Sequence, residues 1–171
     1  LDDYLQIRIQ AAEGRSALIV GGGFIGSELA AALSATLNVT MLFPDAYLCS
    51  RVFPDYLGQA VQRRFQERGI NILGSDKPVS FSKNGGRFLT RTVNGKTIES
   101  DLVIVGIGVA PETALAQGAG LEVGNGVVVN QYLQTSHPDI YAAGDNTFFP
   151  YQALGQSMRI EHWDNAISQG K

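Results

Sequence analysis

The sequence predicts an α/β fold whose centre is a parallel sheet of the βαβ type. Apolar runs suited to buried strands alternate with segments of helical periodicity over residues 16–73. A glycine-rich turn, Gly21-Gly22-Gly23-Phe24-Ile25-Gly26, separates the first of these strands from the first of these helices. Residues 78–100 change to short alternating runs broken by Asn-Gly pairs. Those runs predict an antiparallel three-stranded meander that serves as the crossover to a further strand.

The first part of the chain alternates regularly between the two kinds of element. The expected elements are a short helix at 3–12, a strand at 16–20, a helix at 25–36, a strand at 39–43, a helix at 54–68 and a strand at 70–73. Pro54 suits the start of the second long helix, and Gly69 suits a C-cap. This βαβαβ order is one mononucleotide-binding half of a doubly wound, Rossmann-like sheet.

The elements after the meander are shorter. Residues 102–105 form an uninterrupted apolar run, which is typical of a buried parallel strand, and the run ends in Gly106-Ile107-Gly108. Residues 127–129 and 140–143 predict two more strands, and the second is followed by Gly144-Asp145. Residues 159–171 predict the beginning of a helix.

Composition and charge narrow the classes of protein. Hydrophobic residues make up 44% and charged residues 17% of the chain, as in a soluble globular protein, and the formal net charge is −3. The acidic balance argues against nucleic acid as a partner, and no apolar run has the ~20 residues of a membrane span. Cys49 is the single cysteine, which excludes an internal disulfide and a cysteine-based metal cluster. We expect a reduced cytoplasmic protein, or an organellar one in a eukaryote, with no metal site. The oligomeric state stays open.

The glycine turn predicts a bound dinucleotide. Gly21 permits the tight turn off the strand, Gly23 lets a pyrophosphate approach the backbone, and Gly26 lets the helix pack closely on the strand. The start of the helix offers unpaired N–H groups and a partial positive charge to the phosphates.

An acid after the second strand predicts which nicotinamide cofactor is bound. Asp45 follows Gly21 by 24 positions, near the ~20 expected for the carboxylate that accepts hydrogen bonds from the adenosine ribose. Such a carboxylate repels a 2′-phosphate, so NADH is favoured over NADPH. An ordinary turn aspartate is the alternative, and Arg51 leaves NADPH open because its guanidinium could bind a 2′-phosphate.

Four ordered motifs carry a resemblance to a known family. Residues 21–32 with Leu42-Phe43-Pro44-Asp45, and residues 103–111, resemble the NAD-binding domain of the pyridine nucleotide–disulfide oxidoreductase superfamily. Residues 135–145 are similar to its second flavin motif. Residues 159–166 resemble the tail motif of its oxygenase-coupled ferredoxin reductase and apoptosis-inducing factor branch.

The resemblance implies a domain organisation. Residues 1–110 would be an NAD(H)-binding domain, and residues 111–171 would be part of an FAD-binding domain contributing strands of its own. The family's first FAD motif would precede Leu1 and a further domain would follow Lys171, so we expect the chain to be a piece of a larger flavoprotein.

The resemblance also implies residue roles. Phe24 would lie between nicotinamide and flavin, Glu28 would lie near the nicotinamide, and Ile25 belongs to the same NAD-binding turn. Arg51 would lie near the adenosine end, although a solvated loop arginine is nearly as good an interpretation. Gly106, Ile107 and Gly108 would pass close to the nicotinamide. The flavin side would use Gly144, Asp145, Glu161, His162 and Trp163; a plain turn is the alternative for Gly144-Asp145.

The expected function is to place NADH for hydride transfer to FAD, with electrons passing on to a ferredoxin-like or other acceptor. One alternative is a redox-signalling protein of the apoptosis-inducing factor type, whose output is an NADH-dependent conformational change or binding. Another is a disulfide reductase whose cysteines lie outside this chain. The full-length protein is expected to be an FAD-dependent NAD(P)H oxidoreductase. The chain alone is expected to bind NADH weakly, to retain no FAD and to be inactive.

Overall fold

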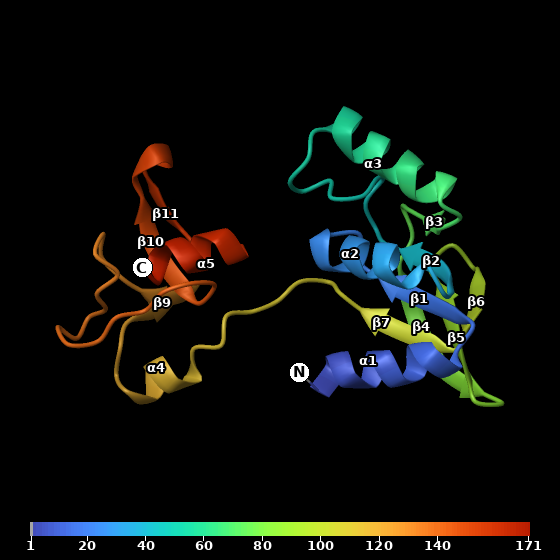
Figure 1. Cartoon of the computed structure of the whole chain (residues 1–171), viewed down its shortest axis with the longest axis horizontal. Coiled ribbons are helices and arrows are strands. Elements are labelled where there is room, and N and C mark those ends of the chain that lie inside the picture. The colour runs from blue at the N-terminus through green and yellow to red at the C-terminus, as the bar shows by residue number, and fades with distance from the viewer. Residues whose placement is uncertain (1) are drawn as a thin grey trace. The chain divides into compact units, whose positions relative to one another are not determined.

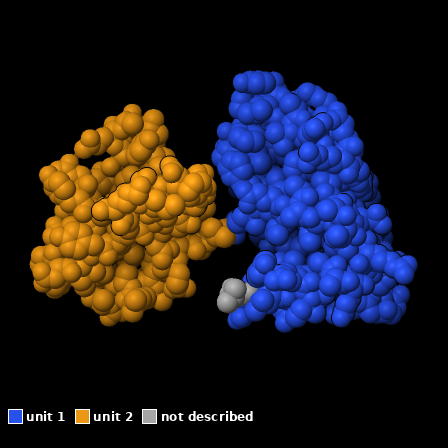
Figure 2. All heavy atoms as spheres, in the orientation of Figure 1, with its two compact units in different colours: residues 1–108 blue, residues 109–171 orange. Residues whose placement is uncertain are grey.

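A computed structural model describes residues 2–171 of the chain. The residues form two compact units, which divide between Gly108 and Val109 (Figure 2). Each unit has its own sheet and is described separately below.

Unit 1 is built on a four-stranded parallel sheet in the order β3-β2-β1-β7. The strands are β1 (Ser16–Val20), β2 (Asn38–Leu42), β3 (Asn71–Leu73) and β7 (Leu102–Val105). In the central pairs Val20 lies opposite Leu42 on β2 and opposite Val105 on β7. The carboxyl ends of these three strands therefore meet at one edge of the sheet, which is where ligands bind in open α/β sheets.

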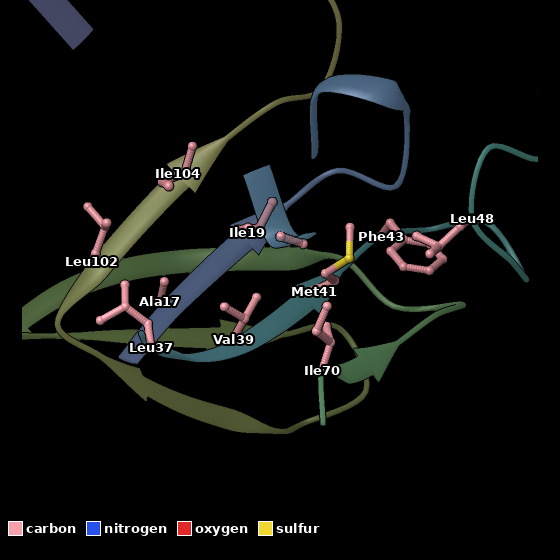
Figure 3. Packing of buried hydrophobic residues seen from close by; sticks show 11 residues of the cluster. Ala17, Ile19, Leu37, Val39, Met41, Phe43, Leu48, Ile70, Leu102 and Ile104 are labelled. Carbon is pink, nitrogen blue, oxygen red and sulfur yellow. The ribbon is translucent and has the colours of Figure 1, made fainter. Parts of the chain in front are cut away.

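Three helices cover one face of this sheet: α1 (Asp2–Glu13), α2 (Phe24–Leu33) and α3 (Asp55–Glu67) (Figure 1). Alternate residues of β1, β2 and β7 project to that face and form the main core, as Figure 3 shows for Ile19, Met41 and Ile104. Period-two alternation along each strand explains why these positions are apolar together.

The antiparallel meander packs against the opposite face. It consists of β4 (Pro78–Asn84), β5 (Arg87–Thr92) and β6 (Thr97–Ser100). Leu18 and Val20 of β1 form a second buried cluster with Leu42, against which Ile98 of β6 packs. Unit 1 therefore has helices on one side of the parallel sheet and the meander on the other, and the predicted α/β fold with its meander crossover is confirmed.

The predicted elements of unit 1 match closely, with small shifts at their ends. The helix expected at 25–36 begins at Phe24 and ends at Leu33, because Ser34 already forms the C-cap with its N–H bonded to Ala30. Gly69 follows α3 with φ +83°, a conformation that suits glycine.

A carboxylate fixes the amino ends of the two strands that carry the glycine turns. Asp101 precedes β7, and its Oδ2 accepts hydrogen bonds from the backbone N–H groups of Arg15 and Ser16, each at 2.9 Å. Its Oδ1 accepts from Arg87 Nε at 2.9 Å. These donors lower the pKa of Asp101 to about 2, with the Arg15 N–H the largest cause. The network ties β1, β7 and the meander together at the edge opposite to the glycine turn.

Unit 2 contains a second four-stranded sheet in the order β11-β10-β9-β8. The strands are β8 (Val123–Gly124), β9 (Gly126–Val128), β10 (Thr147–Tyr151) and β11 (Gln156–Met158). Two short α-helices, α4 (Ala114–Gly118) and α5 (Trp163–Gln169), and a 3-10 turn, η1 (Gln152–Leu154), complete the unit. The strand expected at 127–129 is confirmed as β9, one residue earlier.

Two predictions in unit 2 need correction. Residues 140–143 are not a strand: they make one isolated bridge, between Tyr141 and Gln134, and the Ile140 and Tyr141 side chains are exposed. An apolar run forms a stable strand only where neighbours pair with it and cover it, and here they do not. The helix expected from residue 159 begins at Trp163, because His162 adopts an extended N-cap conformation.

Candidate functional site

The glycine turn leaves β1 and enters α2 with almost no room for side chains. Gly21 has φ +127°, and a Cβ there would lie 2.1 Å from the carbonyl oxygen of Gly106. A Cβ at Gly26 would lie 2.3 Å from the carbonyl oxygen of Gly21. Both separations are far below van der Waals contact, so glycine is required at each position for the turn to close.

Gly23 stands in the opposite situation. Apart from Gly23 itself and its two chain neighbours, no heavy atom of residues 2–171 lies within 4 Å of the place where its Cβ would be, so this side of the backbone faces open space. Gly23 is also the N-cap residue of α2 and makes no side-chain cap, which leaves the first N–H groups of the helix available to a ligand. This is the geometry that a pyrophosphate needs.

Gly22 was not among the predicted residues, although the sequence held a signal for it. A Cβ at Gly22 would lie 2.7 Å from Cγ of Phe43, so the turn packs directly on a fully buried ring at the end of β2. Three consecutive glycines, where the motif needs only the first and third, indicated that the second position was also crowded.

The segment after β2 brings the predicted acid and base to the glycine turn. Asp45 is half-buried and Arg51 is exposed, and both line a pocket with the turn. The backbone N–H of Cys49 donates to the carbonyl of Gly22 at 2.7 Å, which holds this segment beside the turn. One acidic and one basic side chain therefore face the same space.

The carboxyl end of β7 forms another wall of that pocket. Gly106 donates its N–H to Val20 at 2.8 Å, and Gly108 has φ +118°. Ile107 between them is 73% exposed. The three residues line the same pocket as the glycine turn, because β1 and β7 are parallel neighbours whose carboxyl ends meet.

Phe24 is an exposed aromatic at the start of α2. It is 54% exposed, and its ring meets the edge of Phe53 at a centroid distance of 5.6 Å. Glu28 lies one helical turn later and is exposed, so the two side chains share a face of α2. More than half of the Phe24 side chain is therefore open to solvent at the edge of the pocket.

These features enclose one pocket of about 260 Å³ within unit 1. Its lining residues are Gly21, Gly22, Gly23, Phe24, Pro44, Asp45, Cys49, Ser50, Arg51, Val52, Gly106, Ile107 and Gly108. Ile25, Gly26 and Glu28, also predicted, adjoin the turn without lining the pocket. Burial raises the pKa of the Cys49 thiol, and its contact with Ser27 at 3.9 Å opposes that shift only partly, so the thiol is neutral near pH 7.

A larger groove of about 590 Å³ lies between α1 and α2. Its lining is mostly apolar, from residues such as Ile7, Leu29 and Leu33, with Arg8 as its one charged side chain. It contains neither the glycine turn nor the acid, so the smaller pocket is the better candidate for a charged dinucleotide.

The predicted flavin residues all belong to unit 2. Gly144 has φ +84°, and its N–H donates to Gln169 Oε1 of α5 at 2.7 Å. Asp145 follows with an exposed side chain, and its backbone carbonyl accepts from Arg159 at 3.3 Å. A left-handed glycine followed by an exposed carboxylate suits a polar ligand next to this turn. The Nε2 of Gln169 is buried without a partner in residues 2–171, so an acceptor next to it would satisfy a free donor.

The tail motif surrounds the start of α5. Glu161 forms an ion pair with Arg159, and His162 caps α5 by accepting the N–H of Asp164 at its Nδ1. The imidazole stacks on the exposed Trp163 ring at 5.8 Å. These three side chains are thus presented together on the surface of unit 2.

Among residues 2–171, no three His, Cys, Asp or Glu side chains are grouped so that they could hold a metal ion. None of the helices in the same range combines the length and apolar character needed to cross a bilayer.

The fold and the pocket are those of an α/β protein with a glycine-rich turn at the carboxyl edge of a parallel sheet, where open α/β sheets bind ligands. The pyridine nucleotide-disulphide oxidoreductase family model matches residues 1–170. The chain belongs to this family, whose members are FAD-dependent oxidoreductases of pyridine nucleotides.

Its relatives include enzymes with different acceptors. The chain is 38% identical over 169 residues to the ferredoxin–NAD(+) reductase component of an anthranilate 1,2-dioxygenase system of Burkholderia cepacia, covering 98% of this chain and 41% of that protein. It is 35% identical over 167 residues to monodehydroascorbate reductase 2 of Arabidopsis thaliana, covering 96% and 38%. The chain thus spans about two fifths of the length of these curated relatives.

Solved structures of ferredoxin reductases also match nearly the whole chain. A ferredoxin reductase from Rhodopseudomonas palustris matches with a TM-score of 0.91 and 31% identity, over 98% of this chain and 42% of that one. The reductase in a covalent putidaredoxin reductase–putidaredoxin complex matches with a TM-score of 0.90 and 34% identity, over 99% and 42%.

Proposed function

We propose that this chain is the NAD(H)-binding part of an FAD-dependent NADH oxidoreductase. Residues 1–110 form the NAD(H)-binding domain, and residues 111–171 are a segment of the FAD-binding domain. The observation that carries the proposal is the pocket of unit 1, in which an open Gly23 lies between an acidic wall at Asp45 and the Gly106–Gly108 wall.

The pocket suggests how NADH lies. The pyrophosphate occupies the space at Gly23 and accepts hydrogen bonds from the first N–H groups of α2. The adenosine ribose then reaches Asp45, whose carboxylate accepts from both hydroxyls, and Arg51 lies near the same end. The nicotinamide extends toward Phe24, Glu28 and the Gly106–Gly108 wall.

Phe24 acts as a movable cover for the nicotinamide. Its exposed ring packs on Phe53 alone among the aromatic rings of the described chain, so displacement costs little. Glu28, exposed one turn later on α2, would accept a hydrogen bond from the carboxamide N–H of a bound nicotinamide. No side-chain acid or base is needed, because FAD, when bound, supplies the acceptor for the hydride.

In unit 2 the residues that would hold FAD are the Gly144-Asp145 turn and the surface formed by Glu161, His162 and Trp163. The exposed Asp145 carboxylate can accept hydrogen bonds from the ribityl hydroxyls. The side chains of Glu161, His162 and Trp163 would border the flavin ring.

The acceptor of the electrons is proposed to be a ferredoxin-like protein, in the manner of the oxygenase-coupled reductases. The support is the Burkholderia cepacia relative and the putidaredoxin complex. A redox-signalling role of the apoptosis-inducing factor type rests only on the tail motif. A thiol-linked reductase is the second candidate, because an NAD-dependent persulfide reductase from A. fulgidus matches with a TM-score of 0.90 at 27% identity.

Calorimetry of the 171-residue chain tests the nucleotide. NADH is expected to bind weakly but more tightly than NADPH, and D45N is expected to narrow the difference. Tighter NADPH binding by the parent chain would refute the role of Asp45. We also expect the purified chain to carry no flavin, and a near-stoichiometric flavin absorbance band would refute that expectation.

The acceptor requires the full-length flavoprotein. NADH-dependent turnover should be measured in parallel with a ferredoxin, with monodehydroascorbate and with a persulfide, and kcat/KM compared. We expect the ferredoxin to be preferred. Preference for a persulfide would instead establish the thiol-linked reductase, and NADH-dependent binding without turnover would favour the signalling role.

A further inference from the structure

The segment between β2 and α3, residues 44–53, carries both side chains proposed to meet the adenosine end of NADH. We refer to it as the adenosine loop. It is fixed near its start by the Ser75 N–H, which donates to the Asp45 carbonyl at 2.9 Å. It is fixed later by the Cys49 N–H, which donates to the Gly22 carbonyl at 2.7 Å.

Between those two points, one side chain of the loop forms a hydrogen bond to α3 among residues 2–171. Tyr47 is half-buried, and its hydroxyl donates to the carboxylate of Asp55, the first residue of α3. This bond to a carboxylate is the largest cause of the raised pKa of Tyr47. Hydrogen bonds to charged groups are stronger than neutral ones, so this bond adds to the anchoring that the fully buried Leu48 side chain gives the loop.

Gly58 of α3 provides the space for the Tyr47 ring. A Cβ at Gly58 would lie 2.3 Å from Cδ2 of Tyr47 and 2.8 Å from the carbonyl oxygen of Leu48. Gly58 is the one buried residue of α3, although glycine in a helix interior costs roughly 0.5–1 kcal/mol relative to alanine. A ring in a glycine slot and a hydroxyl on a carboxylate together fix where the loop lies against the helix.

We propose that Tyr47 is a positioning residue for NADH recognition, holding the adenosine loop on α3 through Asp55 and Gly58 so that Asp45 meets the ribose. Tyr47 is two residues from Asp45, so a shift at Tyr47 acts first on Asp45, whereas Cys49, held on Gly22, separates Tyr47 from Arg51. The inference rests on the proposed function. It adds that the discrimination between a free and a phosphorylated 2′-hydroxyl depends on a residue that does not line the pocket.

The test uses probes that contain the adenosine end without nicotinamide: ADP-ribose and 2′-phospho-ADP-ribose, titrated into the 171-residue chain by calorimetry. The variant is Y47F, which removes the hydroxyl and keeps the ring. We expect ADP-ribose affinity to fall about three- to tenfold, in line with loss of one charged hydrogen bond. The affinity for 2′-phospho-ADP-ribose should fall less, because the Asp45 carboxylate that repels the 2′-phosphate is also released. The preference for ADP-ribose over 2′-phospho-ADP-ribose should therefore become smaller.

Tyr56 offers the matched control. It lies on α3 next to Asp55 and is 75% exposed. Y56F removes a tyrosine hydroxyl, as Y47F does, but from a residue outside the adenosine loop. D55N is a second variant, which keeps an acceptor oxygen without the charge and is expected to give a smaller loss in the same direction.

The outcomes separate the inference from the function. Unchanged affinity and preference in Y47F, or an equal loss for both probes, would overturn the positioning role and leave the proposed function standing. If the parent chain binds neither probe, or prefers the 2′-phosphate, the proposed NADH site fails and the inference fails with it.

Discussion

The Gly21 turn of unit 1 and the Gly144 turn of unit 2, which are both proposed to bind nucleotides, are held in different ways. Gly21 follows a strand that is buried along nearly its whole length, and its turn closes against backbone atoms of Gly106 and Gly26. Gly144 follows a segment that is not a strand, and the nearest obstacle to a Cβ there is a side chain, Ala166, at 3.4 Å. Backbone fixes the first turn, whereas side chains of one short helix support the second.

The cores of the two units differ in the same sense. Among residues 2–171, every buried apolar side chain belongs to unit 1 except Val127 and Val129. Burial of apolar area is the main source of stability, so unit 1 has what it needs to hold its turn rigidly. A glycine turn can therefore be rigid or adjustable according to the core behind it.

The largest effect is expected from Gly26→Ala. The new methyl would lie 2.3 Å from a backbone oxygen that has no room to move, because Gly21 is itself packed on Gly106. We expect unit 1 to lose roughly 3 kcal/mol or more in free energy of unfolding, measured by urea denaturation. In an unobstructed helix the change from glycine to alanine stabilises by up to about 1 kcal/mol. The sign of the change in free energy of unfolding therefore tests the close contact at Gly26.

Gly23→Ala is the matched control in the same turn. With nothing within 4 Å and φ −83°, alanine fits at Gly23, and the free energy of unfolding should change by no more than about 1 kcal/mol. NADH binding should nevertheless fall at least about tenfold, because the methyl occupies the space of the pyrophosphate. Equal stability losses in the two variants would contradict the tight packing assigned to Gly26.

The regular part of the fold could be predicted from the sequence because local signals and burial agree there. In β1, alternate residues face two different covered surfaces, so Leu18 and Ile19 are both buried and the whole run is apolar. In unit 2 the signals misled. Residues 140–143 have strand composition but make one isolated bridge. Strand β10 was not predicted, and its Pro150 is a residue that central strands seldom contain.

The candidate site could be predicted in part for a related reason. Gly21, Asp45 and Gly106 each follow a parallel strand, and the carboxyl ends of such strands meet at one edge. The positions of Cys49 and Tyr47 depend on how the adenosine loop folds back on the glycine turn and on α3. No spacing rule describes such a loop, so their contacts became visible only in three dimensions.

A middle-sized effect is expected at the other edge of the unit 1 sheet, from Asp101→Asn. The folded-state pKa of Asp101 is about 2, below the 3.8 of a free side chain, so its stabilisation is present above pH 3.8 and is lost as the pH falls toward 2. We expect D101N to cost about 1–2 kcal/mol at pH 7, less than the full shift implies because the side chain is partly exposed.

The prediction for Asp101 is measured by urea denaturation of the unsubstituted chain and of D101N between pH 7 and pH 2.5. The difference between their free energies of unfolding should shrink as the pH falls below 4. Glu99→Gln is the control, since Glu99 pairs with the same Arg87 at 2.6 Å but is 54% exposed, and it should change stability by about 0.5 kcal/mol or less. A gap that stays constant down to pH 2.5 would show that the Asp101 carboxylate is not the titrating group.

The smallest effect on the whole chain is expected from Gly144→Ala, the counterpart in unit 2 of the first substitution. At φ +84° alanine costs roughly 1 kcal/mol, about a fivefold change in a local opening equilibrium. Hydrogen exchange should therefore quicken about fivefold in α5 and around Gly144, whose N–H is bonded to Gln169.

Gly155→Ala, also at positive φ but with no atom within 4 Å, should quicken exchange only around η1. The unfolding midpoint of unit 1 should not move in either variant. If Gly144→Ala lowered it, the second turn would share the stability of the unit 1 core, and the contrast between a backbone-fixed and a side-chain-supported turn would no longer hold.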